Sequence, residues 1–492
     1  MRVLPKLLLR GKKADPLVDN SMQQAHAAKC KDHRETHRSS ILISRMRVVK
    51  DVVQKLFSCE KYHCGATVCC AYFANAMMYM IIGPTMLDIA QQTSSSYEEA
   101  SHAVVTREIS FLIGSLTFGC LFVRCISNRV TLMVTLLLSG LATLAVPFTS
   151  SVHVFVMLQG IVGFMIAGLD VSATVWMREI GCDQAHAYSQ AMHASYAIGQ
   201  MLIPMICAPF LSSRNRTSTL LARSPLNSEE ASDSRIVFPY LIAASVGLVT
   251  SLGILVLHIK KSFAGTAGKM NEDADIDVTR PTEPVQVKDV TSRRYLIVTI
   301  LLTCVFAGSY SGMEQDTLTF LPQFVFFNNF NVSRKTAALM ASVLSAAFAL
   351  VRCLSILFAS RKASPHLMLC CNMVITITGN IILLNFSKDQ GSHPLTWMAL
   401  VLLGTGLSSS QAATNAFVGK RTRMTNTLVG LMLFCGRLVS IVSAYFIPLW
   451  IEASPLILVQ TNLIYLCVSC FALLAFFAND AASRSTKANE QV

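Results

Sequence analysis

Long runs of apolar residues recur along the chain, separated by shorter polar stretches. Each run is close to the about 20 apolar residues that an α-helix needs to cross a bilayer. The pattern predicts an all-α membrane protein with twelve transmembrane helices, six on each side of a long polar gap. The expected helices lie at about residues 66–90, 105–123, 130–149, 152–177, 187–211, 237–258, 295–324, 336–359, 366–386, 395–418, 427–450 and 456–478.

The gap at residues 259–294 is rich in charged residues, contains Pro281 and Pro284, and has no apolar periodicity. It is therefore expected to be a flexible linker between two bundles. Two six-helix halves joined in this way are typical of major facilitator transporters. The predicted division is a basic cytoplasmic N-terminal tail (1–65), a first bundle (66–258), a cytoplasmic linker (259–294), a second bundle (295–478) and a cytoplasmic C-terminal tail (479–492).

Composition and charge agree with a membrane location. Only 14% of the residues are charged, against about 25% in soluble proteins, which excludes a soluble enzyme and a disordered chain. The net charge of +13 could suggest nucleic acid, but residues 1–65 hold 14 of the 41 Lys and Arg residues and residues 259–294 hold seven more. Basic segments of this kind stay on the cytoplasmic side. Both termini are expected in the cytoplasm, with no nucleic-acid partner.

Three Asn-x-Ser/Thr sequons begin at Asn215, Asn331 and Asn385. They fall in the fifth, seventh and ninth connections between the expected helices, which all lie on the non-cytoplasmic side in this topology. Glycosylation acts only on that side. The sequons therefore support the helix count, predict a glycoprotein, and favour the plasma membrane.

Two segments carry a family resemblance. The first helix ends Gly83-Pro84-Thr85-Met86-Leu87-Asp88, and the fifth contains Gln190-Ala191-Met192-His193-Ala194-Ser195-Tyr196-Ala197-Ile198-Gly199. Both are similar to the major facilitator superfamily domain-containing protein 4 family, the group like sodium-dependent glucose transporter 1. The resemblance implies the major facilitator fold, sugar transport and coupling to sodium.

The same resemblance implies gating roles for Arg124 and Arg352. Three positions depart from the family pattern. Val123 stands where an aspartate usually precedes the arginine, Val351 stands where a glycine usually precedes Arg352, and Arg437 stands where the family more often has an acidic residue. Substrate and coupling ion therefore do not follow directly from the family.

Polar residues inside the expected helices are candidates for a substrate site, because they are costly in a bilayer unless they serve a pathway or a pair. On the first, fourth and fifth helices, amide, hydroxyl and ring groups recur at helical spacing. Such groups suit the hydroxyls and the apolar face of a sugar. The alternative is that they hydrogen-bond neighbouring helices. The candidates in this half are Asn75, Tyr79, Asp170, Gln190, His193 and Gln200.

The seventh helix carries Ser309, Gly312, Asp316, Thr319 and Gln323 on one face, so Asp316 is a further substrate candidate. Glu314 lies about 200° away around a regular helix, unless the helix breaks near Gly312 and exposes carbonyls to a cation. Glu314 is the candidate for coupling transport to sodium or protons. The alternative is an ion pair with Arg352 or Arg437.

The tenth helix carries another polar stripe, which adds Gln411 and Asn415 to the substrate candidates. No phosphate-binding Gly-x-x-x-x-Gly-Lys-Ser/Thr loop occurs, which argues against ATP-driven transport. No nucleophile–base constellation can be named, so an enzyme is not predicted, and neither a cofactor nor a metal centre is expected.

The sequence predicts a secondary transporter that moves a small polar solute, first of all a sugar such as glucose, across the lipid bilayer by alternating access. One alternative is another solute, such as an organic anion bound by Arg352 or Arg437. The other is a membrane scaffold that retains a transporter fold without transport.

Overall fold

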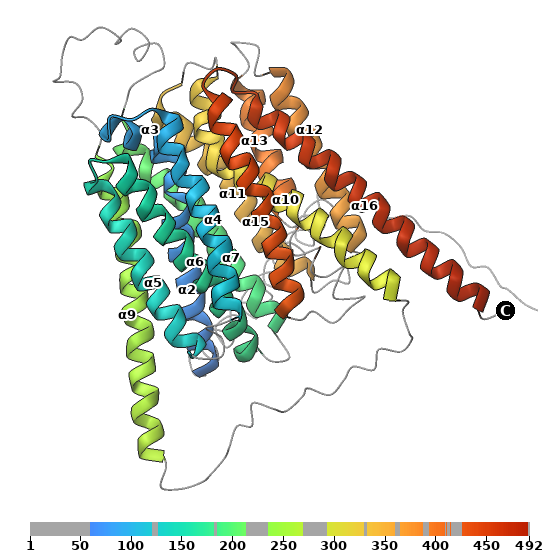
Figure 1. Ribbon diagram of the computed structural model, residues 1–492, viewed down its shortest axis with the longest axis horizontal. Coiled ribbons are helices and arrows are strands. Elements are labelled where there is room, and N and C mark those ends of the chain that lie inside the picture. Colours follow the sequence, from blue (N-terminus) through green and yellow to red (C-terminus); the bar gives the residue numbers. More distant parts are fainter. Residues whose placement is uncertain are drawn as a thin grey trace, which may run out of the picture. The chain divides into compact units, whose positions relative to one another are not determined.

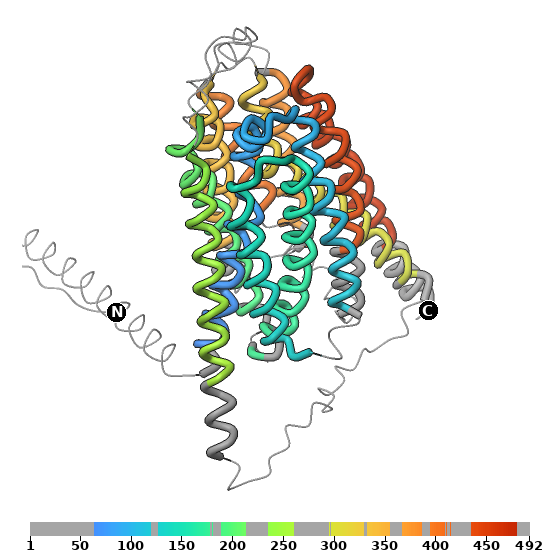
Figure 2. Tube along the Cα trace, turned by 60° about the vertical axis from the view of Figure 1, so that its left-hand side comes forward, coloured from blue at the N-terminus to red at the C-terminus, as the bar shows by residue number. Residues whose placement is uncertain are grey.

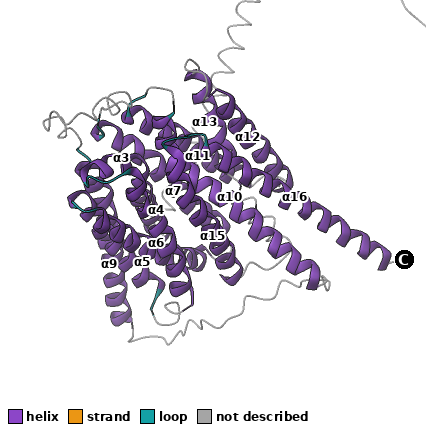
Figure 3. Cartoon of the chain, turned by 45° about the horizontal axis from the view of Figure 1, so that its top comes forward, coloured by secondary structure: helices purple, strands orange, loops and turns teal. Residues whose placement is uncertain are grey.

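A computed structural model shows a chain that is helical wherever it forms regular structure among the described residues (Figure 3). Residues 65–492 form one compact unit, and the helices are described within it. The structure describes residues 60–120, 126–181, 185–212, 235–268, 293–328, 332–359, 365–386, 393–408, 410, 414 and 426–490.

The first half contains α2, α3, α4, α5, α6, α7 and α9, in blue to green in Figure 1. The helix pair α2–α3 is one predicted span that bends by 41°. Pro84 causes the bend because it has no N–H to donate to the carbonyl of Met80, four residues earlier. The bounds are α2 Glu60–Met80, α3 Ile82–Gln92, α4 Tyr97–Cys120, α5 Asn128–Ala145 with a 3-10 turn Val146–Phe148, α6 Val152–Gly181, α7 Ala185–Cys207 with a 3-10 turn Ala208–Phe210, and α9 Val237–Gly268.

The second half contains α10, α11, α12, α13, α15 and α16, in yellow to red. Their bounds are α10 Arg293–Phe327, α11 Arg334–Ala359, α12 Pro365–Phe386, α13 His393–Ser408, α15 Asn426–Ile451 and α16 Ile457–Glu490. Helices α9 and α10 extend beyond the bundle limits expected from the apolar pattern, and residues 269–292 of the expected linker lie outside the described residues. The domain division stays a prediction.

The helices follow all twelve predicted apolar runs, as far as each run is described. Within the described residues, nine helices are long and apolar enough to span a membrane, or ten if α2 and α3 count as one span. The two others are α4, which carries Arg107 and Glu108, and α13, of which 16 residues are described. The outer surface of the helices is apolar: Phe471 on α16 is 73% exposed and Val249 on α9 is 67% exposed.

Among the described residues, the two halves are in contact where α4 packs on α15, α7 on α11, and α3 on both α10 and α11. Within the first half, α9 lies alongside α5, as the turned view in Figure 2 shows. Helix α4 also packs closely on α6, because Gly163 lets α6 approach the backbone of Arg107, where a Cβ atom would clash with the carbonyl. Helix α4 is therefore held between α6 of its own half and α15 of the other.

Candidate functional site

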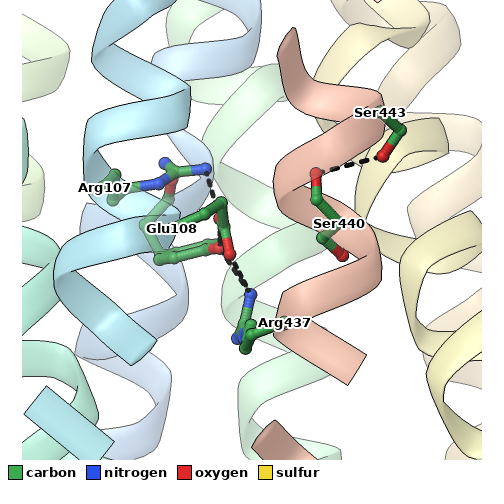
Figure 4. A network of polar contacts seen from close by, with 6 residues as sticks. Arg107, Glu108, Arg437, Ser440 and Ser443 are labelled. Atoms are coloured by element: carbon green, nitrogen blue, oxygen red, sulfur yellow. Dashed lines mark hydrogen bonds and ion pairs between the residues drawn. The ribbon is translucent and has the colours of Figure 1, made fainter. Parts of the chain in front are cut away.

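An ion pair joins the two halves where α4 faces α15 (Figure 4). The Nη1 atom of Arg437 donates to Oε2 of Glu108 at 2.9 Å. The hydroxyl of Tyr79 on α2 donates to the other carboxylate oxygen of Glu108. It also accepts a hydrogen bond from Nη1 of Arg437 at 2.7 Å. Three helices from two halves thus meet at one carboxylate, whose residue is only 2% exposed.

A second guanidinium, that of Arg107 in the first half, lies next to this ion pair. Arg107 precedes Glu108 on α4, and its Nη1 donates to the backbone carbonyl of Tyr79 at 2.7 Å. The guanidinium lies 3.8 Å from the centroid of the Tyr79 ring, a cation–π geometry. Its Nη2 lies 3.6 Å from Oε1 of Glu108. The contacts fix the tyrosine between two arginines, so that its hydroxyl points at the ion pair.

Asp170 on α6 provides a second carboxylate that interacts with Arg437. Its Oδ1 accepts a hydrogen bond from Nδ2 of Asn75 on α2 at 3.4 Å. Tyr72, also on α2, and Arg437 both interact with the Asp170 carboxylate. Arg437 therefore interacts with a second carboxylate besides that of Glu108, which Arg437 shares with Arg107.

The second half contributes its own ion pair, between Nη2 of Arg352 on α11 and Oε1 of Glu314 on α10, at 3.9 Å. The Nε and Nη2 atoms of Arg352 also donate to the Ser408 carbonyl on α13, at 3.2 and 3.0 Å. The guanidinium lies 4.3 Å from the Phe348 ring centroid. Helix α10 is continuous through Gly312, so the helix break considered for this position does not occur.

Helix α7 connects the two groups of charges. The rings of His193 and Tyr196 pack edge-on against Tyr72, with centroids 5.8 and 6.2 Å apart. Tyr196 interacts electrostatically with groups of both halves, and His193 interacts with Arg352. The groups near Tyr196 are Tyr79, Asp170, Arg437 and Glu314.

We call this assembly the central cluster. Its ionisable core comprises three arginines and three carboxylates: Arg107, Arg352, Arg437, Glu108, Asp170 and Glu314. When all six are ionised, the charges sum to zero. Such a site offers hydrogen-bond donors, acceptors and aromatic faces without an excess charge to attract an ion.

Of the residues predicted from the sequence, the structure brings six to the central cluster and places three elsewhere. The six are Asn75, Tyr79, Asp170, His193, Glu314 and Arg352. Asp316 lies against Tyr465 on α16 instead. Gln190 and Gln200 lie on α7 and are buried, and neither amide atom of Gln200 has a hydrogen-bond partner among the described residues.

Other predicted residues lie outside the described part of the chain: Arg124, Gln411, Asn415, Asn215 and Asn331. Asn385 is described as an exposed residue near the end of α12. Its glycosylation stays a prediction.

Sequence reasoning missed Glu108 and did not single out Tyr196. Glu108 lies within an apolar run, and its partner Arg437 is 329 positions away. A signal was available, because two adjacent charges inside a span require partners. Tyr196 lies in the matched fifth-helix segment, three residues after His193, which indicates the same face of the helix.

A separate set of contacts joins the halves where α3 ends and α11 begins. Nη1 of Arg334 lies 3.4 Å from Oδ1 of Asp88 and donates to Oε1 of Gln91 at 3.2 Å. Nearby, Nε2 of Gln323 on α10 donates to the Gly83 carbonyl at 2.5 Å. We call these contacts the α3–α11 latch. The halves are thus tied both through the central cluster and at this end.

Comparisons with known proteins place the fold in a family. The Major Facilitator Superfamily model matches residues 68–444. The sodium-dependent glucose transporter 1 of Xenopus laevis is 24% identical over 341 residues, which cover 68% of this chain and 65% of that protein. The major facilitator superfamily domain-containing protein 4A of Xenopus tropicalis is 23% identical over 394 residues, 69% of this chain and 76% of that one.

A solved structure shows the same fold. The crystal structure of a D-xylose-proton symporter aligns over 84% of this chain and 96% of its own, with a TM-score of 0.58 and 11% sequence identity. The chain therefore has the major facilitator fold, with helices that pass through a membrane many times.

The chain belongs to the major facilitator superfamily. The resemblance to the domain-containing protein 4 family, expected from the first and fifth helices, is confirmed by the relatives.

We predict that Tyr79→Phe destabilises the protein, because it removes the hydroxyl that contacts both Glu108 and Arg437 but keeps the ring beneath Arg107. A hydrogen bond to a charged group contributes about 1.5–3 kcal/mol. Thermal unfolding of the purified protein should show a lower midpoint.

Tyr97→Phe is the matched control, because the Tyr97 hydroxyl is equally buried and has no hydrogen-bond partner among the described residues. Its midpoint should not fall. Equal losses in the two variants would show that the Tyr79 hydroxyl does not stabilise the ion pair.

Proposed function

We propose that the chain is a secondary transporter of a small neutral polar solute, with a sugar as the leading candidate. The observation that carries the proposal is the position of the His193 and Tyr196 face of α7 between the ion pairs of the two halves. A pyranose has hydroxyls all round and apolar C–H faces. Imidazole, phenol and guanidinium groups can bind the hydroxyls, and the tyrosine rings can pack on the apolar face.

Charge balance favours a neutral solute over an organic anion. The three arginines of the central cluster each interact with a carboxylate, so an anion would have to displace an existing partner. The similarity to a sodium-dependent glucose transporter in sequence and to a D-xylose-proton symporter in fold supports a sugar as the solute.

Alternating access would require the contacts between the halves to change in sequence. The α3–α11 latch closes one end and has to separate for that end to open. The Glu108–Arg437 contact joins α4 of the first half to α15 of the second half. If this pair lies near the pivot of the rocking motion, its atoms move less than those at the ends of the bundles. We therefore propose that the latch opens and closes while the central ion pair persists.

We propose that both termini are cytoplasmic, that the sequons face outward, and that the plasma membrane holds the protein. The basic N-terminal tail and the sequon positions support this topology. Epitope tags on the two ends should bind antibody only after cells are permeabilised. A tag accessible in intact cells would contradict the proposed orientation.

We predict that His193→Ala weakens sugar binding about tenfold, because losing one hydrogen bond to the solute costs about 1.4 kcal/mol. Binding is measured as the shift in thermal midpoint of the purified protein with each sugar, followed by uptake into proteoliposomes. The control is Ser195→Ala, because the Ser195 hydroxyl donates to the Ala191 carbonyl of its own helix.

Each result separates the candidate functions. Stabilisation by organic anions and not by sugars would favour an anion transporter. A protein that no solute stabilises or crosses would favour the scaffold. Unchanged sugar affinity in His193→Ala would leave transport possible but remove this residue from the substrate site.

A further inference from the structure

Asp316 on α10 is a buried carboxylate that lacks a positive partner. Its residue is 2% exposed, and no cationic side chain lies within 4 Å of it among the described residues. Glu108, Glu314 and Asp88 each have an arginine. Among the described residues, the charged side chain that interacts electrostatically with Asp316 is Glu108, which is also negative. An uncompensated charge in this position is costly, so the carboxylate must bind either a cation or a proton.

Oxygen atoms from two other helices surround this carboxylate. The Tyr465 hydroxyl on α16 lies 3.2 Å from Oδ2 of Asp316, and Ser443 on α15 lies within hydrogen-bonding reach of the same group. The Ser443 hydroxyl donates to the Ser440 carbonyl at 3.0 Å, as Figure 4 shows. Helices α10, α15 and α16 therefore converge on Asp316 with oxygen donors that carry no positive charge.

Two unpartnered oxygens lie one helical turn from these groups. Asn462 precedes Tyr465 by three residues and uses its amide N–H groups on Thr317 and Asn380, at 2.9 and 3.3 Å. Its Oδ1 is buried and has no hydrogen-bond partner among the described residues, and the same holds for Oγ of Ser440. Buried polar atoms are normally paired. Unpaired oxygen atoms on the two helices that contact Asp316 suggest a ligand that binds several oxygen atoms at once.

We propose that Asp316, Ser443, Tyr465 and Asn462 bind a sodium ion within the second half, apart from the central cluster. Carboxylate, hydroxyl and amide oxygens are hard ligands suited to hard cations. A single charge on the ion matches the single carboxylate. A proton would neutralise Asp316 but would leave the Asn462 oxygen unpaired, so the oxygen set favours the metal ion.

The position of this site provides a route for coupling. A bound ion would hold α10, α15 and α16 together, and α15 carries Arg437 of the central ion pair. Glu314 lies two residues before Asp316 but contacts Arg352 on α11. The ion would therefore act on α10 and α15, two of the three second-half helices that contribute charges to the central cluster. This coupling role rests on the proposed transport function, whereas the ion site itself does not.

The direct test is the thermal midpoint of the purified full-length protein in rising NaCl, with choline chloride keeping the ionic strength constant. When an ion binds only the folded state, each tenfold rise in its concentration above the dissociation constant raises the folded-to-unfolded ratio about tenfold. The wild-type midpoint should rise with sodium, and Asp316→Asn should abolish the rise.

A milder pair of variants keeps the test valid if Asp316→Asn fails to fold. Ser443→Ala should shift the sodium response to concentrations at least several-fold higher. Ser342→Ala should leave it unchanged, because Ser342 is another buried serine whose hydroxyl donates to its own helix, at Ala338. Equal sodium responses in Ser443→Ala and the wild type would overturn the ligand set.

A wild-type midpoint that ignores sodium but rises on acidification, with the rise lost in Asp316→Asn, would replace the ion with a proton and overturn the sodium site. Sugars measured in the same assay separate this proposal from the preceding one. Stabilisation by sugar without stabilisation by sodium would refute only the ion site. Stabilisation by sodium without any response to solutes would leave the ion site and refute the transport proposal.

Discussion

The contact between Glu108 and Arg437 constrains the arrangement of the other polar groups. Glu108 is buried and the Arg437 side chain is only 12% exposed, so either charge alone would lose its nearest counter-ion with little water to replace it. The pair therefore holds α4 against α15. On the other side of α4, the absence of a Cβ atom at Gly163 allows α6 to pack closely on it. Tyr79 and Arg107 complete the geometry because both contact the same carboxylate. The two halves thus share a fixed point, around which contacts at the ends can form and separate.

The remaining charges are arranged around this fixed point. Asp170 of the first half interacts with Arg437, and Glu314 offsets Arg352 within the second half. The balance explains how a membrane-spanning bundle can hold three arginines in its interior. The same balance supports our proposal of a neutral solute over an anion. The leftover carboxylate is Asp316, whose compensation we assign to an ion on the opposite side of α10.

The fold was predictable from the sequence to a greater extent than the site. Apolar runs of bilayer length predict spans directly, and α3 to α16 follow them because no other structure satisfies the backbone in lipid. Helical spacing also correctly placed Glu314 and Asp316 on different faces of α10, where they contact Arg352 and Tyr465. Spacing within one helix does not, however, say which helix lies opposite. For that reason Asp316 was assigned to the substrate and Glu108 was overlooked, although their partners on α16 and α15 decide what each carboxylate does.

A double-mutant cycle on the central ion pair tests this account most directly. Glu108→Gln, Arg437→Gln and the double variant are compared by thermal unfolding of the purified protein, converted to free energies of unfolding. Each single variant leaves one buried charge without its partner and should lose about 3–5 kcal/mol. The double variant leaves neither charge of the pair, so its loss should be well below the sum of the two single losses. Losses that add within about 0.5 kcal/mol would show that Glu108 and Arg437 do not act as a pair and would contradict the account.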